Sequence, residues 1–273
     1  MKKLRITCYS QAYWKVTFDN PPLNLIDPDV LHELKELINQ FEAAANNELK
    51  VVVFDSANPE FYIAHVDILR GGGRGPTDVG PIGLRILPDF IQRLSRLPII
   101  TIASIRGRTR GIGAEFVEGL DIRFGSREKM ILGQSEVGAA LIPGAGGTEY
   151  LPLLVGRARA FEIIVGSEDY DAEIAERYGW INRAIPDAEL DDFVDRFARR
   201  IASFEKKALT EAKRLVNRSS RLPDDAHIVA ASDTFLRMLT WSETQSRIAK
   251  ILERGFQKPG DFELRLGYHL GVE

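Results

Sequence analysis

Two glycine-rich stretches, GRTRGIGAE at residues 107–115 and GQSEVGAALIPGAGGT at residues 133–148, decide how this chain is expected to fold. The first follows IITIASI (99–105), a continuous apolar run of strand length. Small residues at a strand-to-helix junction leave backbone N–H groups that can stabilise a developing negative charge. Taken alone, the stretch favours a tight turn followed by a solvated Glu115, with charge stabilisation as the alternative.

Neither stretch fits a nucleotide-binding motif. In GIGAEF (111–116), the third glycine of a dinucleotide fingerprint would fall at Phe116, and GAGGT (144–148) lacks the lysine of a phosphate loop. A third cluster, GGGRG (71–75), is typical of a flexible loop. A nicotinamide-dependent oxidoreductase is therefore a remote alternative.

The segments around these stretches alternate between strand and helix patterns. Asp27 and Pro28 form an N-cap and N1 pair, and the helix that they open is predicted to end near Asn46 or Asn47. A second helix is expected over 84–97. The predicted strands are a pair within 4–19 and further strands at 51–56, 99–105, 121–126, 130–134 and 180–185. This order predicts an α/β fold.

From about residue 187 the pattern is helical throughout. The predicted organisation is a core of residues 1–190 followed by a helical C-terminal subdomain of residues 191–273, which packs on the core or on another subunit.

Composition excludes several classes of function. The 273 residues carry a net charge of −3 without a basic block, so a nucleic-acid partner is not expected. No apolar run approaches the length of about 18 residues that a membrane helix needs. The single cysteine and the lack of a signal-peptide pattern favour a cytoplasmic protein, and the four histidines show no metal-ligand spacing.

Read together, four motifs resemble the crotonase (enoyl-CoA hydratase/isomerase) family in the expected order. They are NPPLN at 20–24, YIAHVD at 62–67, GRTRGIGAE at 107–115 and GQSEVGAALIPGAGGT at 133–148. The resemblance spans roughly residues 12–186. It implies a spiral of ββα units with a helical C-terminal part that packs in a homotrimer or homohexamer. It also implies an acyl-CoA thioester substrate, fatty acid metabolism, and no metal or other cofactor.

The resemblance also implies the site. The backbone N–H groups of Val66 and Ile112 would hold a thioester enolate, and Glu115 and Glu136 match both glutamates of the hydratase branch. Hydration needs a base for the attacking water and a proton for the α-carbon, and two adjacent buried carboxyls provide both because their pKa values separate. We expect Glu136 to handle the α-proton and Glu115 to hold and activate the water.

Further contacts follow from the same motifs. Substrate contacts are expected from Ala64, His65, Asp67, Arg70, Gly111, Leu141 and Lys258. Asp67 is expected to orient the loop that carries Val66, Arg70 and Lys258 to approach coenzyme A phosphates, and His65 to contact coenzyme A or to lie partly exposed at the pocket mouth. Arg106, Arg108 and Arg110 are expected to be solvated rather than to bind phosphates. The acyl pocket is expected to draw on Ile86, Leu87, Phe90 and Leu141.

The leading hypothesis is an enoyl-CoA hydratase. Double-bond isomerisation by Glu136 alone, thioester hydrolysis, and a non-catalytic acyl-CoA-binding protein are the alternatives. Four residues depart from the family pattern: His65 and Ile112 replace a usual glycine, and Ile63 and Val66 are bulkier than is common at their positions.

Overall fold

The computed structural model describes residues 1–45, 48–70 and 79–272. The loop predicted at GGGRG and the end of the first helix predicted at Asn46 or Asn47 lie outside these residues. The described chain alternates strands and helices up to about residue 185 and is helical after it. The predicted α/β class is therefore confirmed.

A six-stranded sheet forms the centre of the molecule, in the order β1-β2-β3-β5-β7-β10. β1 and β2 are antiparallel, and the other neighbours are parallel. Because helices cover both faces of this sheet, its central strands are continuously apolar, as predicted. The strands are β1 (Leu4–Cys8), β2 (Tyr13–Phe18), β3 (Val51–Ser56), β5 (Ile100–Ile105), β7 (Ile122–Ser126) and β10 (Arg183–Ile185).

A second sheet of short strands, in the order β4-β6-β8-β9, was largely missed by the sequence patterns. Its strands are β4 (Phe61–Ile63), β6 (Arg108–Arg110), β8 (Ile131–Gly133) and β9 (Tyr170–Asp171). These segments are two or three residues long and leave too few positions to show a period. Only β8 coincides with a predicted strand. The second sheet matters for the site because both glycine-rich stretches leave from it.

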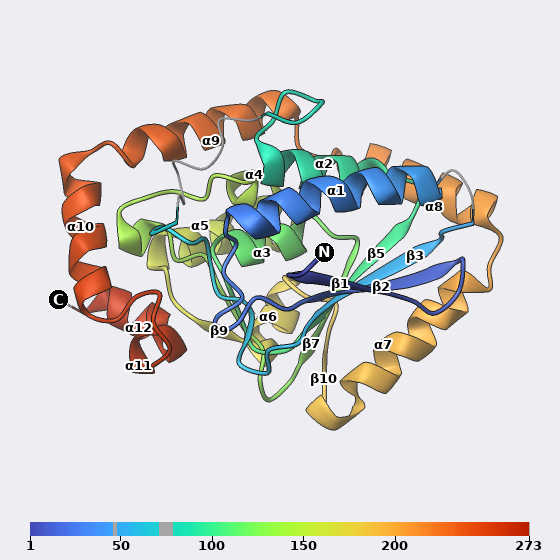
Figure 1. The fold of residues 1–273 in the computed structure, drawn as a ribbon, viewed down its shortest axis with the longest axis horizontal. Helices are drawn as coiled ribbons and strands as arrows, with labels where there is room; N and C mark the ends of the chain where they lie inside the picture. The colour runs from blue at the N-terminus through green and yellow to red at the C-terminus, as the bar shows by residue number, and fades with distance from the viewer. Residues whose placement is uncertain (46–47, 71–78, 273) are drawn as a thin grey trace.

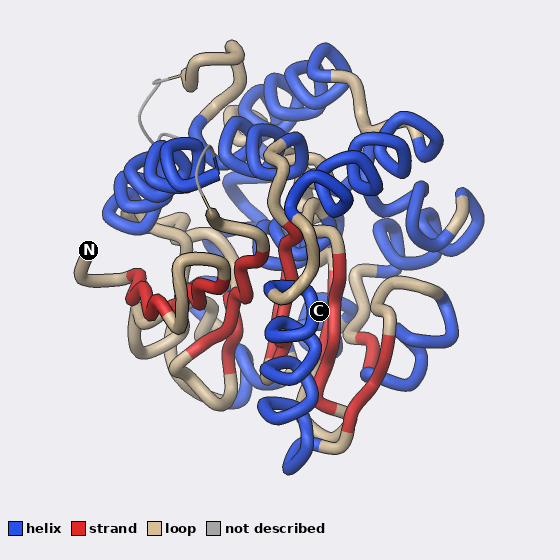
Figure 2. Tube along the Cα trace, turned by 90° about the vertical axis from the view of Figure 1, so that its right-hand side faces the viewer, coloured by secondary structure: helices blue, strands red, loops and turns tan. Residues whose placement is uncertain are grey.

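The helices that precede the C-terminal part surround the sheets (Figures 1 and 2). The predicted Asp27 cap is confirmed, since its carboxylate accepts a 2.8 Å hydrogen bond from Val30 N. These helices are α1 (Pro28–Ala45), α2 (Ile86–Arg96), α3 (Ile112–Glu118), the 3-10 turn η1 (Val137–Ala139), α4 (Gly147–Val155), α5 (Arg157–Gly166) and α6 (Ala172–Tyr178).

The large sheet separates two apolar clusters. On one face, Val16, Val52 and Phe54 pack with α1, α2 and α3. On the other face, Val51 and Val53 pack mainly against α7 (Asp187–Ala202), and Leu209 of the following helix packs on the same cluster. Figure 1 shows α1 and α2 above the sheet and α7 below it. The expected domain boundary at 190/191 thus falls inside α7, a helix that covers the core sheet.

The remaining helices continue around the molecule to the C-terminus. They are α8 (Lys206–Ser220), α9 (Asp225–Met238), α10 (Ser242–Glu253), α11 (Asp261–Leu264) and α12 (Leu266–Gly271). The end of this region returns to the second sheet, where it forms an apolar cluster with η1. Within the described ranges, no helix combines the length and apolar character needed to cross a membrane.

Candidate active site

A cavity of about 160 Å³ lies where the two glycine-rich stretches and the segment after β4 meet. Val66, Ile112, Glu115 and Glu136, which the sequence assigned to one site, all line it. The structure therefore brings together residues that are up to 70 positions apart in the chain. Much of the rest of the wall is apolar and comes from Leu31, Ile86, Leu87, Leu141, Phe235, Leu236 and Phe256.

The backbone N–H groups of Val66 and Ile112 are unpaired in the described part of the chain. Ile26 N donates to His65 O and Asp67 N donates to Ile26 O, so the intervening Val66 N–H has no partner on that side. Ile112 is the first residue of α3, where backbone N–H groups lack intrahelical acceptors. Both residues line the cavity, so two unpaired backbone donors belong to its wall.

Gly111 makes the turn before α3 possible. Its φ of +52° lies in the region that favours glycine, and a Cβ atom there would meet Glu136 Oε1 at 2.7 Å. Gly111 therefore allows both the change of chain direction and the approach of Glu136. The nearby Gly113 allows close packing of α3, since a Cβ would lie 2.5 Å from Ile63 O.

Glu115 is buried, and the second glycine-rich stretch holds it. Its Oε1 accepts hydrogen bonds from Ala145 N at 2.7 Å and Gly147 N at 2.9 Å. Burial raises the pKa of this carboxyl to about 7, although the two N–H donors oppose the shift. GAGGT, which cannot serve as a phosphate loop, thus holds a carboxylate, and the solvated Glu115 that the first stretch favours when taken alone is wrong.

Glu136 has a different environment. Its Oε2 is buried and has no hydrogen-bond partner in the described part of the chain. Burial raises the pKa of this carboxyl well above its usual value, and the charge of Glu115 raises it further. Glu115 can therefore ionise near neutral pH, supported by two N–H donors, while Glu136 keeps its proton. The pair can supply one base and one acid.

Glu118, one helical turn after Glu115, is a buried carboxyl that the sequence did not single out. Its Oε1 accepts hydrogen bonds from Gln134 Nε2 at 2.9 Å and Trp180 Nε1 at 3.0 Å, and its Oε2 has no described partner. Burial, with a smaller effect from the charge of Glu115, raises its pKa to about 8. Only the packing around α3 reveals this group, because a glutamate at this position is compatible with an exposed helix face.

Replacing Glu118 with glutamine should change how stability depends on pH. An unfolded glutamate ionises near about 4.3, whereas the folded pKa is about 8. Between these pH values the folded state binds one more proton than the unfolded state. As the pH rises through this range, the free energy of unfolding of the wild type therefore falls by up to about 1.4 kcal/mol per pH unit relative to that of Glu118→Gln. Urea unfolding from pH 5.5 to 7.5 checks this, and parallel profiles for the two proteins would contradict it.

His65 does not lie partly exposed at the pocket mouth, so that expectation is wrong. The side chain is buried, although it borders the cavity. Its ring stacks on Phe256 with centroids 4.2 Å apart, and Nε2 lies 3.0 Å from Glu263 Oε1. The sequence could not indicate this because Glu263 is 198 residues away.

Of the other residues expected to contact the substrate, some are held in contacts within the protein, and others stay predictions. Asp67 accepts hydrogen bonds from Arg70 N and Gln257 Nε2, both at 2.9 Å, consistent with orienting its loop. Arg70 forms ion pairs with Asp27 and Asp29 rather than presenting a free guanidinium. Ala64 is buried and does not line the cavity, whereas Gly111 and Leu141 do. Lys258 is exposed and stays a prediction for phosphate binding.

The expectation that Arg106, Arg108 and Arg110 are solvated is wrong for Arg110, whereas the other two side chains are partly exposed and form ion pairs. Arg106 pairs with Asp187, and Arg108 pairs with Glu60. Arg110 is fully buried. These arginines connect the strand ends to segments both earlier and later in the chain, because each guanidinium finds an acceptor that only the fold brings near.

Three of the four residues predicted for the acyl pocket line the cavity. Ile86, Leu87 and Leu141 line the cavity, whereas Phe90 points into the core instead. Phe235 and Leu236 of α9 complete the wall and were not predicted. Their helical spacing gave no signal that distinguished them from ordinary packing residues.

Two free N–H donors and two buried carboxyls around an apolar cavity define a site that can stabilise a carbonyl oxyanion while it moves protons. Comparison with known proteins agrees with this class. The family model described as enoyl-CoA hydratase/isomerase matches residues 9–258. The chain belongs to this family of enzymes.

Individual relatives support the assignment. A crystal structure from Streptomyces avermitilis, provisionally described as an enoyl-CoA hydratase, is 40% identical with a TM-score of 0.93, covering 100% of this chain and 97% of that one. The short-chain-enoyl-CoA hydratase of Clostridium acetobutylicum is 27% identical over 88% of this chain and 90% of its own length. The probable mitochondrial enoyl-CoA hydratase 2 of Arabidopsis thaliana is 32% identical over 80% of this chain and 71% of its own length. The predicted crotonase-like fold is confirmed.

Proposed function

We propose that the protein hydrates a 2-enoyl-CoA to the 3-hydroxyacyl-CoA. The observation that carries this proposal is the pair of carboxyls, Glu115 and Glu136, in different environments on one cavity wall. Hydration needs both an acid and a base, whereas double-bond isomerisation needs one group that moves a proton. The names of the hydratase relatives support the same reaction.

The residues divide the reaction as follows. The ionised Glu115 accepts a proton from water as the water oxygen bonds to the β-carbon. The electrons of the double bond move toward the thioester carbonyl, and the N–H groups of Val66 and Ile112 donate to the enolate oxygen. Neutral Glu136 then delivers its proton to the α-carbon. The pair ends with Glu115 protonated and Glu136 ionised, so Glu115 must lose a proton and Glu136 must regain one before the next turnover.

The acyl group that this cavity favours is apolar. Its wall includes Leu31, Leu87 and Phe235, and its volume is about 160 Å³. An apolar cavity of about 150 Å³ can hold a benzene-sized group, so we propose a short to medium acyl chain. Coenzyme A is part of the substrate, and the proposed chemistry needs no further cofactor or metal. The proposal also includes a cytoplasmic enzyme of fatty acid metabolism that assembles as a homotrimer or homohexamer.

Isomerisation is the second candidate because the unpartnered Oε2 of Glu136 is free to move a proton between two carbons of a bound acyl chain. In such a reaction Glu115 would have no chemical step. Thioester hydrolysis and binding without turnover need no division of roles between the two carboxyls, so the site favours them less.

A Glu115→Gln variant separates hydration from isomerisation. Hydration of crotonyl-CoA, followed as loss of the conjugated thioester absorbance, should fall at least about 100-fold because glutamine cannot accept the proton of water. Conversion of a 3-enoyl-CoA to the 2-enoyl-CoA should stay within about tenfold of wild type, since one mobile proton is enough for it.

Two outcomes would contradict the proposal. Equal hydration by Glu115→Gln and wild type would remove Glu115 as the base. Binding of crotonyl-CoA without turnover by the wild type would favour a binding protein.

A further inference from the structure

The two peptide groups that flank Val66 are held by different contacts. The 65–66 peptide is held through its carbonyl, since His65 O accepts from Ile26 N at 3.0 Å, and its N–H is the free donor of Val66. The 66–67 peptide donates through Asp67 N to Ile26 O at 2.9 Å, and its carbonyl lies 2.8 Å from His65 Nδ1. The His65 ring therefore restrains the backbone just after the donor.

The C-terminal segment restrains the same loop from outside. The side-chain oxygen of Gln257 accepts hydrogen bonds from Ile68 N at 3.0 Å and Leu69 N at 3.2 Å. Glu263 Oε1 lies 3.0 Å from His65 Nε2 and also accepts from Gln257 N at 2.6 Å. Two residues of the C-terminal segment, Gln257 and Glu263, thus form hydrogen bonds with the loop that carries Val66.

Both ring nitrogens of His65 face oxygen acceptors, namely Val66 O and Glu263 Oε1. A neutral imidazole carries one N–H, so both hydrogen bonds form only when the ring is protonated or the glutamate is neutral. Burial acts to raise the pKa of Glu263, but the charge and hydrogen bond of His65, the N–H of Gln257 and the charge of Arg110 together lower it. These contacts keep Glu263 ionised beside the ring.

We propose that His65 is a positioning residue that fixes the Val66 N–H toward the substrate oxyanion, with Glu263 and Phe256 holding the ring in place. This inference rests on the proposed function, because it concerns the oxyanion donor of that reaction. It also explains why a bulky residue is accommodated where the family usually has glycine. The His65 side chain links the C-terminal segment to the loop that carries Val66.

Two substitutions separate the contacts of the ring. Asparagine places an amide nitrogen near the position of Nδ1 and keeps a donor for Val66 O, whereas glutamine places it near Nε2 and keeps a donor for Glu263. We expect His65→Asn to keep kcat for crotonyl-CoA within about threefold, and His65→Gln to lower it about tenfold to 100-fold, as expected for a displaced oxyanion donor. The dissociation constant of butyryl-CoA, which does not react, should change less than about threefold in both.

A second readout does not depend on hydration. Acetoacetyl-CoA forms an enolate that absorbs in the near ultraviolet, and an intact oxyanion hole stabilises this enolate in the bound state. His65→Gln should bind acetoacetyl-CoA with less of the enolate absorbance than wild type, and His65→Asn should restore it. Should His65→Gln fail to fold, His65→Leu replaces it as the variant without a donor.

The chain contains a matched control in the same C-terminal segment. His269 stacks on Phe262 with centroids 5.0 Å apart, and its Nε2 lies 2.8 Å from Asp261 Oδ2. Among the described residues, no hydrogen bond or ring contact joins His269 to the loop that carries Val66. His269→Gln should leave kcat and the enolate absorbance unchanged. Equal losses in His269→Gln and His65→Gln would overturn the proposal in favour of general loosening of the segment.

The outcomes also distinguish this proposal from the proposed function. If the wild type does not hydrate crotonyl-CoA but the enolate absorbance still depends on His65 as stated, the positioning role stands and hydration is wrong. If hydration is normal and the asparagine and glutamine variants behave alike in both readouts, the positioning role is wrong and hydration stands.

Discussion

Replacing Glu136 with glutamine is expected to lower kcat for hydration by about 10³-fold or more, near the upper range for loss of a general acid–base group. Glutamine keeps the shape of the side chain beside Gly111 but has no carboxylic proton for the α-carbon. The effect should be larger than that of Glu115→Gln, because that variant keeps Glu136 as the donor of the α-proton and water can still attack the polarised double bond without its base. Steady-state kinetics with crotonyl-CoA measure it.

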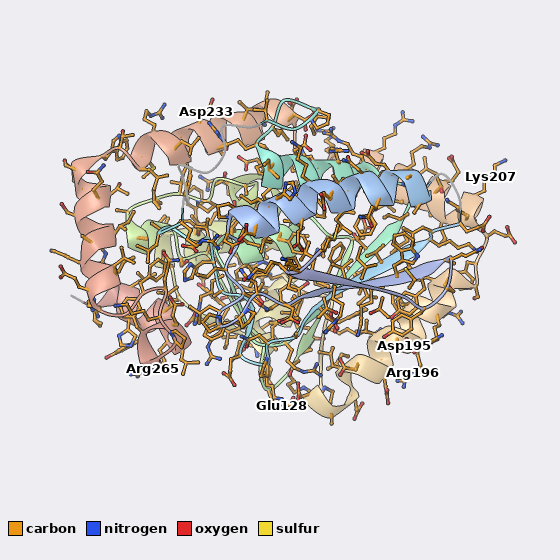
Figure 3. All side chains as sticks on the ribbon, viewed as in Figure 1. Glu128, Asp195, Arg196, Lys207, Asp233 and Arg265 are labelled. Atoms are coloured by element: carbon orange, nitrogen blue, oxygen red, sulfur yellow. The ribbon has the colours of Figure 1, made fainter. Side chains whose placement is uncertain are left out.

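The control for this variant is a glutamate of the same chemistry outside the cavity. Glu128 is exposed, lies at the edge of the molecule in Figure 3, and accepts a hydrogen bond from Asp187 N that glutamine can also accept. Glu128→Gln should keep the wild-type rate. Hydration by Glu136→Gln within tenfold of wild type, with unchanged butyryl-CoA affinity in both variants, would exclude Glu136 as the proton donor.

Replacing Arg110 with methionine is expected to lower the free energy of unfolding by about 3–5 kcal/mol, as for removal of one partner from a buried ion pair. Arg110 is fully buried and forms two hydrogen bonds with the Asp169 carboxylate, at 2.6 and 2.8 Å. It also donates to Glu263 O at 2.7 Å. Methionine fills much of the volume but leaves the carboxylate and the carbonyl without these donors. Urea unfolding, with the m-value as a check on two-state behaviour, measures the change.

Arg265 provides the surface comparison for this loss. It pairs with Asp261 at 2.6 Å, both side chains are more than half exposed, and it lies at the periphery near α11 and α12 (Figure 3). Exposed ion pairs contribute about 0–1 kcal/mol, so Arg265→Met should change stability by no more than that. Similar small changes in both variants would show that burial of Arg110 does not determine its contribution.

The sequence by itself determined the features that depend on neighbouring residues. The apolar run at Val51–Ser56 predicts a buried strand, and the Asp27–Pro28 pair predicts the start of α1, because each signal lies within one element. Glu115 and Glu136 could also be assigned to one site, since each belongs to a motif whose local spacing resembles that of a known family. The role of Gly111 is also local, because the turn before α3 depends on the backbone angle of this glycine itself.

Only the tertiary structure decided what these groups contact. Glu115 is bonded to Ala145 and Gly147 rather than to solvent, Glu118 is enclosed by Gln134 and Trp180, and His65 pairs with Glu263. The physical reason is that burial and hydrogen-bond partners, which determine whether a carboxyl is an acid or a base, come from segments distant in sequence. A single glutamate in a motif looks the same whether its side chain reaches water or a closed cavity, and the fold makes that choice.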